Sequence, residues 1–147
     1  MGRNFGKWIG IAVLAAIFCG AGLVVSGEAQ ADRFVNNGNG TVTDTQTGLM
    51  WADKDNGSDI NWLSAKSYCE GYSGGGKSGW RMPTIDELRQ LHNSGAFGSV
   101  IRKTEYTIWA SETSGSKAAR FSFYNGYWDW RQQAYWNGRA LPVRSGQ

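Results

Sequence analysis

Aromatic side chains are the feature that most restricts how this chain can fold. Of the 116 residues from Asp32 onward, 17 are Trp, Tyr or Phe. They stand in short runs separated by Gly, Asn, Ser and Thr, and the whole chain has only two prolines. Rings of this size can fill a core that has few Leu and Ile, and this composition argues against a helical bundle and against disorder. We therefore expect one small globular domain.

The first 31 residues differ from the rest of the sequence. Arg3 and Lys7 precede an apolar stretch from Trp8 to Val25, and Ala29-Gln30-Ala31 has the small-x-small pattern of a cleavage site. This order is typical of a secretory signal peptide. It predicts export from a bacterium-like cell and a mature domain of residues 32–147. The alternative is an uncleaved membrane anchor, because about 18 apolar residues can just span a bilayer.

Charge, cysteine and histidine content exclude several classes of function. Residues 32–147 carry 13 basic and 11 acidic side chains, and the basic ones are scattered, so we expect no nucleic-acid partner. Cys69 is the one cysteine of this part and cannot form an internal disulfide. His92 is the one histidine, so a zinc site or a catalytic triad would lack partners. We expect no metal, no cofactor and no enzymatic activity.

The order of local patterns predicts an α+β fold with an antiparallel sheet. Asn61 or Asp59 is expected to cap a first helix that ends at Gly71, and Thr84 with Glu87 forms a capping box for a second helix that ends near Gly95. Asn125-Gly126 is predicted to be a tight hairpin turn. Strands are expected at 33–35, 41–44, 49–51, 108–111, 120–124, 127–131 and 139–144.

Two loops resemble ligand-binding motifs but lack their context. Residues 71–78 match the phosphate-binding P-loop letter for letter. A P-loop needs a strand before it and a helix after it, whereas here a predicted helix precedes the loop and Gly79–Pro83 follows it. We therefore expect a connector and no nucleotide. Residues 37–42 resemble the centre of a calcium loop, but Val35 and Gln46 stand where carboxylates are needed, so a turn is expected.

The last 27 residues contain the candidate binding site. Exposed rings beside Arg and Asn suit stacking on sugar rings or capture of a partner chain, although any single ring could belong to the core. Trp128 and Trp130 share one face of a strand, and an Arg there can form a fork on an anionic group. The predicted ligand-binding residues are Tyr124, Tyr127, Trp128, Asp129, Trp130 and Arg131, with support from Arg120 and Arg139.

Four segments of the chain resemble a known family. They are residues 33–51, residues 62–69, residues 79–88 with Trp80-Arg81-Met82-Pro83-Thr84, and residues 142–146. Together they resemble the domain named after the C-terminal part of the Legionella collagen-like adhesin, over essentially all of residues 32–147. The resemblance implies a C-type-lectin-like fold, with two short helices packed on antiparallel hairpins and sheet. This fold is similar to that of the formylglycine-generating group, and known relatives include adhesins for sulfated polysaccharides.

One departure from the family pattern concerns cysteine. The family has a second cysteine where this chain has Pro142, so the resemblance implies that Cys69 has lost its disulfide partner. Copper-assisted oxidation, which needs a cysteine pair, is then not expected. The resemblance implies a secreted or periplasmic binding module for a glycan, such as a sulfated polysaccharide, or for a protein. The alternative is a structural subunit of a cell-envelope or extracellular assembly, for instance as a homo-oligomer.

Overall fold

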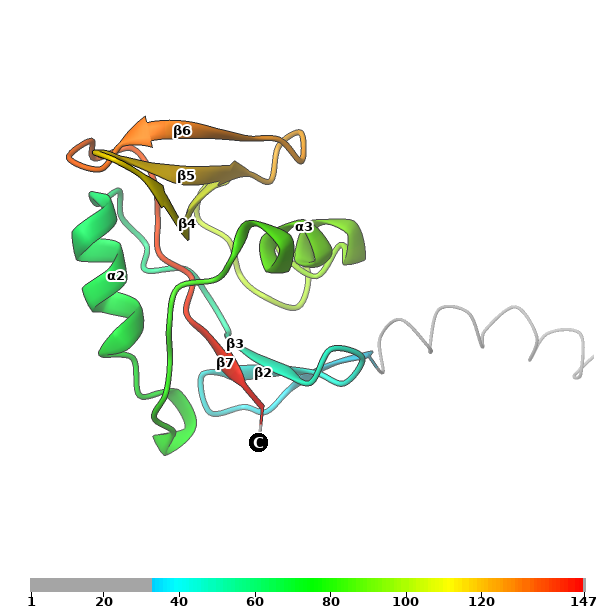
Figure 1. Ribbon diagram of the computed structural model, residues 1–147. Coiled ribbons are helices and arrows are strands. Elements are labelled where there is room, and N and C mark those ends of the chain that lie inside the picture. Colours follow the sequence, from blue (N-terminus) through cyan, green and yellow to red (C-terminus); the bar gives the residue numbers. More distant parts are fainter. Residues whose placement is uncertain (1–32, 147) are drawn as a thin grey trace, which may run out of the picture. The chain divides into compact units, whose positions relative to one another are not determined.

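The computed structural model describes residues 33–146 (Figure 1). The predicted signal peptide, and the membrane anchor that is its alternative, lie outside these residues. Residues 34–146 lie in one compact unit. Within the described range, no helix is long and apolar enough to cross a membrane.

The strands form two antiparallel sheets, which confirms the α+β prediction. The first sheet has the order β1-β2-β3-β7 and the second has the order β4-β5-β6. The strands of the first sheet are β1 (Phe34–Asn36), β2 (Thr41–Asp44), β3 (Leu49–Ala52) and β7 (Val143–Ser145). Those of the second sheet are β4 (Thr107–Ser114), β5 (Lys117–Ser122) and β6 (Trp128–Gln132).

Both helices begin and end at the residues that their sequence signals predict. The Asn61 side chain accepts a hydrogen bond from the Ser64 N–H (2.8 Å) at the start of α2 (Trp62–Glu70). Thr84 and Glu87 form the predicted capping box at the start of α3 (Ile85–Ser94). Gly95 ends α3 with a φ of 74°, a left-handed conformation that glycine adopts without a steric penalty.

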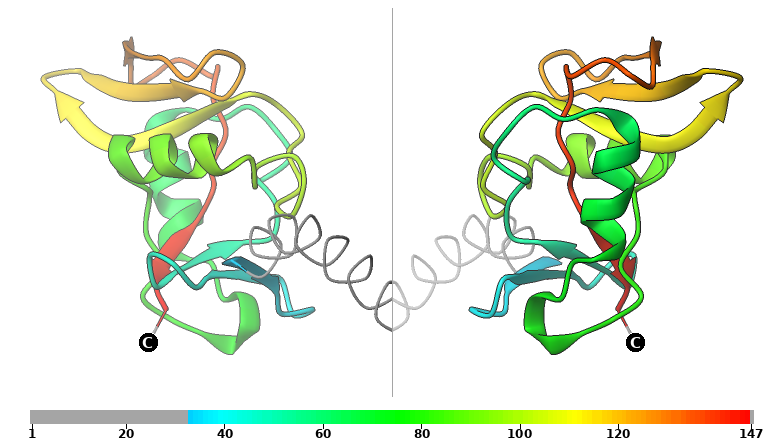
Figure 2. Two further views of the ribbon diagram at one scale, coloured as in Figure 1. Left: turned by 90° about the vertical axis from the view of Figure 1, so that its right-hand side faces the viewer. Right: turned by 90° about the vertical axis from the view of Figure 1, so that its left-hand side faces the viewer.

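The helix α3 lies between the two sheets in all three views (Figures 1 and 2). Its buried side chains Leu88 and Leu91 belong to a core cluster that also contains Trp51 of the first sheet and Phe121 of the second. The helix α2 flanks β4, and a second buried cluster there contains Ala65, Cys69, Met82, Trp109, Ala118 and Ala140.

The segment after β6 joins the two sheets. Figure 1 shows it descending from the second sheet to β7 in the first. The backbone N–H of Trp109 in β4 donates to the Arg139 carbonyl (2.9 Å), and the backbone N–H of Ala52 in β3 donates to the Pro142 carbonyl (2.9 Å). The sequence predicted one strand over 139–144. Only Val143–Ser145 is a strand, paired with β3, because Arg139 bridges β4 and Ala140 exchanges hydrogen bonds with Asn56 instead.

The hairpin between β5 and β6 differs from its prediction. Its turn spans Phe123–Gly126, and Ser122 donates its N–H to the Tyr127 carbonyl (2.8 Å). A two-residue turn would place Phe123 opposite Trp128, whereas Phe121 lies there. The reason is packing: Phe123 is buried, with its ring 4.2 Å from that of Phe97. Burial of this ring takes Phe123 out of the strand.

The two motif-like loops have ordinary structural roles. Gly74–Gly76 forms a single 3-10 turn after α2, and the chain then continues in extended form until α3 begins. This order differs from the strand, loop and helix of a P-loop. Gly75 donates its N–H to the Asn39 carbonyl (3.1 Å), so this turn packs on the β1–β2 turn that resembled a calcium loop.

Candidate functional site

The second sheet and its turn expose four aromatic side chains. They form what we call the aromatic surface: Tyr124, Tyr127, Trp128 and Trp130, with exposed fractions from 37% for Trp128 to 79% for Tyr124. Tyr135 and Trp136, in the loop after β6, are also exposed. Large rings are more often buried, so rings left on a surface are candidates for contact with a ligand.

Trp128 and Trp130 owe their position to the edge of the sheet. They lie opposite Phe121 and Ala119 of β5, and residues paired in this way point to the same face. Phe121 and Ala119 are fully buried, but β6 is the edge strand and its rings extend beyond the core. The two indoles meet edge to face, with centroids 5.1 Å apart. Both are therefore held by packing and still open to solvent.

The other face of the same strands carries a charged ladder. Asp129 lies between two arginines: its Oδ1 is 3.7 Å from Arg120 Nε, and its Oδ2 is 2.7 Å from Arg131 Nη2. Arg120 also donates from Nη1 to the Asn137 carbonyl (2.8 Å). Burial lowers the pKa of Arg120, and the charge of Asp129 acts in the opposite direction. The ladder is thus a fixed array of donors and acceptors.

A pocket of about 240 Å³ lies on this face of the second sheet. Four of the predicted site residues line it, namely Arg120, Tyr127, Trp128 and Asp129. Tyr124, Trp130 and Arg131 do not line the pocket, although Arg131 holds Asp129 through its ion pair. Sequence reasoning missed three polar residues of the lining: Thr107, Ser122 and Asn125. Thr107 and Ser122 are a cross-strand pair, so the register of β4 and β5 would have revealed them.

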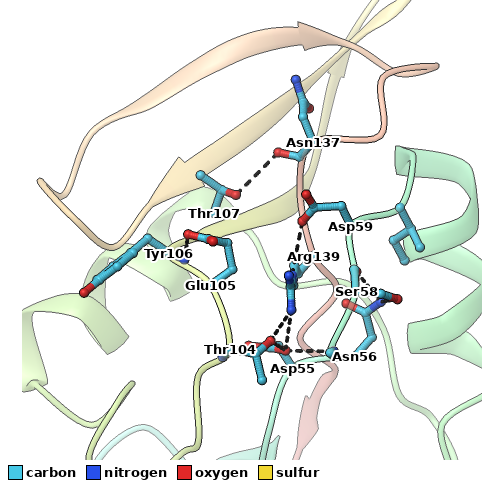
Figure 3. Close-up of polar contacts among 12 residues, drawn as sticks. Asp55, Asn56, Ser58, Asp59, Thr104, Glu105, Tyr106, Thr107, Asn137 and Arg139 are labelled. Atoms are coloured by element: carbon cyan, nitrogen blue, oxygen red, sulfur yellow. Dashed lines mark hydrogen bonds and ion pairs between the residues drawn. The ribbon is translucent and has the colours of Figure 1, made fainter.

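The structure places Arg139 away from this pocket. Figure 3 shows its side chain directed toward Asp55, Asp59 and Thr104. Its Nε is 3.1 Å from Asp59 Oδ1 and its Nη1 is 4.0 Å from Asp55 Oδ1, and it also donates to the Thr104 hydroxyl. Asp55 is fully buried and accepts the Thr104 N–H (2.6 Å). Arg139 therefore joins two loops to the C-terminal segment and does not reach the aromatic surface.

A second hollow, of about 320 Å³, lies between α2 and β4. Trp62 and Met82 line it, with Lys66 and Ser111 among its polar residues. The indole of Trp62 is fixed, because its Nε1–H donates to the Ala110 carbonyl (2.9 Å). The sequence predicted that Trp62 lies on the inner side of the first helix, and it is partly buried against the second cluster.

The side chains of Cys69 and His92 pack against other side chains of the fold. Cys69 is a free thiol and fully buried, as predicted. Burial, together with the charge of Glu70, raises the pKa of the Cys69 thiol to about 12. The His92 ring packs against Phe121 and Phe123. In residues 33–146, no group of three His, Cys, Asp or Glu side chains could hold a metal ion.

The sequence matches the model of one family. The family model of the Lcl C-terminal domain matches residues 40–144. This range runs from the turn before β2 to β7, so it includes both helices, the second sheet with its pocket, and the first sheet except β1. The chain belongs to the Lcl C-terminal domain family. A search of curated proteins found no match.

Proposed function

We propose that this chain is an exported binding module without enzymatic activity, and that it holds a glycan at the aromatic surface and the adjoining pocket. The observation that carries the proposal is a polar pocket on the second sheet whose lining includes two of the four exposed rings, Tyr127 and Trp128. Sugars present C–H faces that stack on aromatic rings and hydroxyl groups that need donors and acceptors. The second sheet supplies both.

The rigidity of the support favours binding. The β5 strand has three fully buried side chains, Ala118, Ala119 and Phe121, and it pairs with β4 on one side and β6 on the other. A site on such a strand needs little ordering when a ligand binds, which preserves affinity. Tyr and Trp add contact area with few rotatable bonds.

The sequence supports the proposed compartment and the choice of ligands to be tested. The predicted signal peptide favours the periplasm, the cell surface or the medium, and intact-mass spectrometry of exported protein tests for Asp32 as the new N-terminus. The family resemblance brings sulfated polysaccharides into the set of glycans to be tested.

A glycan array, followed by titration of the bound compounds, tests the proposal. Tyr127→Ala and Trp128→Ala should each weaken binding by about tenfold or more, as expected for the loss of one ring contact of about 1.4 kcal/mol. Tyr68→Ala, which removes a half-exposed ring from α2, is the matched control. If the parent binds no glycan, or if both surface variants bind as the parent does, the proposal is wrong.

A protein partner is the second candidate, because exposed rings also occur at protein contacts. Tyr135 and Trp136 extend the exposed aromatic area beyond the pocket, which favours a larger contact than one sugar needs. Under this hypothesis the chain is a structural subunit, for instance of a homo-oligomer. Sedimentation of the mature domain separates the two: a stable oligomer that Trp136→Ala dissociates supports the subunit, and a monomer contradicts the homo-oligomer.

A further inference from the structure

The three arginines expected to attract an anionic ligand are paired within the chain. Arg131 places both Nε (2.8 Å) and Nη2 (2.7 Å) on Asp129 Oδ2. Arg120 lies beside the other oxygen of the same carboxylate, at 3.7 Å. Arg139 is held by Asp55 and Asp59. These three arginines and three aspartates balance in formal charge.

The rest of the pocket lining is mostly neutral. Thr107 and Ser122 contribute hydroxyl groups, Asn125 an amide and Tyr127 a phenol. Such groups both donate and accept hydrogen bonds, as sugar hydroxyls do. Asp129 also lines the pocket, and its side chain is 45% exposed. Among residues 33–146, its Oδ1 has only the long contact with Arg120. A carboxylate oxygen in this position accepts a hydroxyl hydrogen and repels a sulfate or carboxylate group.

We infer that the pocket selects a neutral, hydroxyl-rich sugar ring, and that Asp129 sets this selectivity by occupying the two arginines and repelling anionic ligands. The inference rests on the proposed glycan function and assigns the ligand class of the same site. An anionic sugar would have to displace Asp129 from Arg131, or bind close to an uncompensated carboxylate. Either event costs affinity that a neutral ring does not lose.

Replacing one carboxylate oxygen of Asp129 by an amide nitrogen isolates the effect of its charge on binding. Asp129→Asn keeps the shape of the side chain and removes its negative charge, so both arginines become available to an anion. Asp86→Asn removes the same charge from an exposed ion pair with Arg89 on α3 and controls for net charge. Melting of each variant checks that the fold is retained.

The probes are neutral oligosaccharides and their 6-O-sulfated forms on the same backbone, first on an array and then in titrations at fixed ionic strength. The parent should bind a neutral form more tightly than its sulfated counterpart. Asp129→Asn should reduce or reverse that preference by about tenfold, the scale of one charge interaction in a partly desolvated site. Asp86→Asn should keep the preference of the parent.

Two results would overturn the inference, and they are distinguishable. If the parent prefers the sulfated form and Asp129→Asn weakens its binding, Asp129 orients the arginines toward an anion, and glycan binding itself stands. If the parent binds neither form, the proposed function fails together with the inference.

Discussion

The two sheets differ in how the edge strands β7 and β6 are covered and in whether their large side chains are exposed. In the first sheet the edge strand β7 is covered by Arg81, whose backbone exchanges two hydrogen bonds with Val143 (2.8 and 3.0 Å). In the second sheet the edge strand β6 carries Trp128 and Trp130 at 37% and 40% exposure. An open edge strand with exposed rings favours aggregation unless a ligand or a partner covers it. In our interpretation, the first sheet stabilises the fold and the second carries the candidate site.

The same contrast holds between single tryptophans. Trp109 of β4 is fully buried, and its Nε1–H donates to the Ile60 carbonyl (2.8 Å). Trp130 lies in the same sheet, two strands away, and keeps two fifths of its surface in solvent. Residue type therefore says less about role than position in the sheet does. Five predictions test this division, from the largest expected effect to the smallest.

Trp109→Ala should have the largest effect on stability. We expect a loss of about 3–5 kcal/mol, because the change empties a buried site and leaves the Ile60 carbonyl without its donor. Chemical denaturation of the domain measures the loss, and Trp109→Phe, which fills part of the volume, should cost less. A loss below about 1 kcal/mol would contradict the assignment of this ring to the core.

Arg139→Ala should cost about 3 kcal/mol, because it leaves the buried carboxylate of Asp55 without its cation. The matched control is Arg102→Ala. Arg102 is 69% exposed in its side chain and pairs with Asp53 at 3.4 Å, so its loss should cost less than about 1 kcal/mol. A ligand titration adds a second readout: if Arg139→Ala folds normally and loses only binding, Arg139 belongs to the site after all.

Glu87→Gln should lower the free energy of unfolding by an amount that depends on pH. Glu87 holds the side chain of Arg81, whose backbone pairs with the edge strand β7 of the first sheet. Burial would raise the pKa of Glu87, but the hydrogen bonds from Arg81 and from the Thr84 backbone outweigh it, and the pKa is lowered. The carboxylate therefore stabilises the fold above its unfolded pKa, and this contribution is lost as pH falls through the folded value. We expect a cost of about 1–2 kcal/mol at pH 7 that shrinks in acid. Denaturation at several pH values checks this, and an equal cost at all of them would contradict it.

Cys69→Ala should cost about 1 kcal/mol, since it removes one buried sulfur from a small apolar site. Because burial raises the pKa of the thiol to about 12, iodoacetamide at pH 8 should label Cys69 only after unfolding. Mass spectrometry of native and denatured samples measures the labelling. A dimer that dissociates with reductant would contradict this prediction and favour the structural subunit.

Tyr127→Ala should have the smallest effect on stability, within about 0.5 kcal/mol. The ring is 74% exposed, so its removal leaves the core intact. Thermal melts recorded beside those of Trp109→Ala show the contrast directly. A large destabilisation by Tyr127→Ala would mean that the aromatic surface supports the fold, and the division between the two sheets would then fail.

Local signals in the sequence predicted most of the elements. Asn61, Thr84 with Glu87, and Gly95 mark helix ends through hydrogen bonds that span only a few residues, so their effect does not depend on the rest of the fold. The strands at 41–44 and 49–51 of the first sheet were predicted for a similar reason, because Asn and Gly in the short turns beside them allow few backbone alternatives.

The site was predicted in part. The sequence indicated the rings and the arginines of the last segment, but it did not indicate which of them meet. Thr107 lines the pocket because it pairs with Ser122, 15 residues later in the chain. Arg139 lies outside the pocket and pairs with Asp55 and Asp59. Pairings over such distances depend on packing that no short window contains.

The sequence by itself determined the helix ends, the α+β order and an aromatic C-terminal segment, because each follows from interactions between near neighbours. Tertiary structure alone decided which rings are exposed. Burial of Phe123 against Phe97 lengthens the β5–β6 turn. Compared with a two-residue turn, the pairing is shifted by two residues, so that Phe121 and not Phe123 lies opposite Trp128. Core packing has thereby buried Phe121 and left Trp128, its cross-strand partner, at the open edge, and a residue's own chemistry cannot specify that choice.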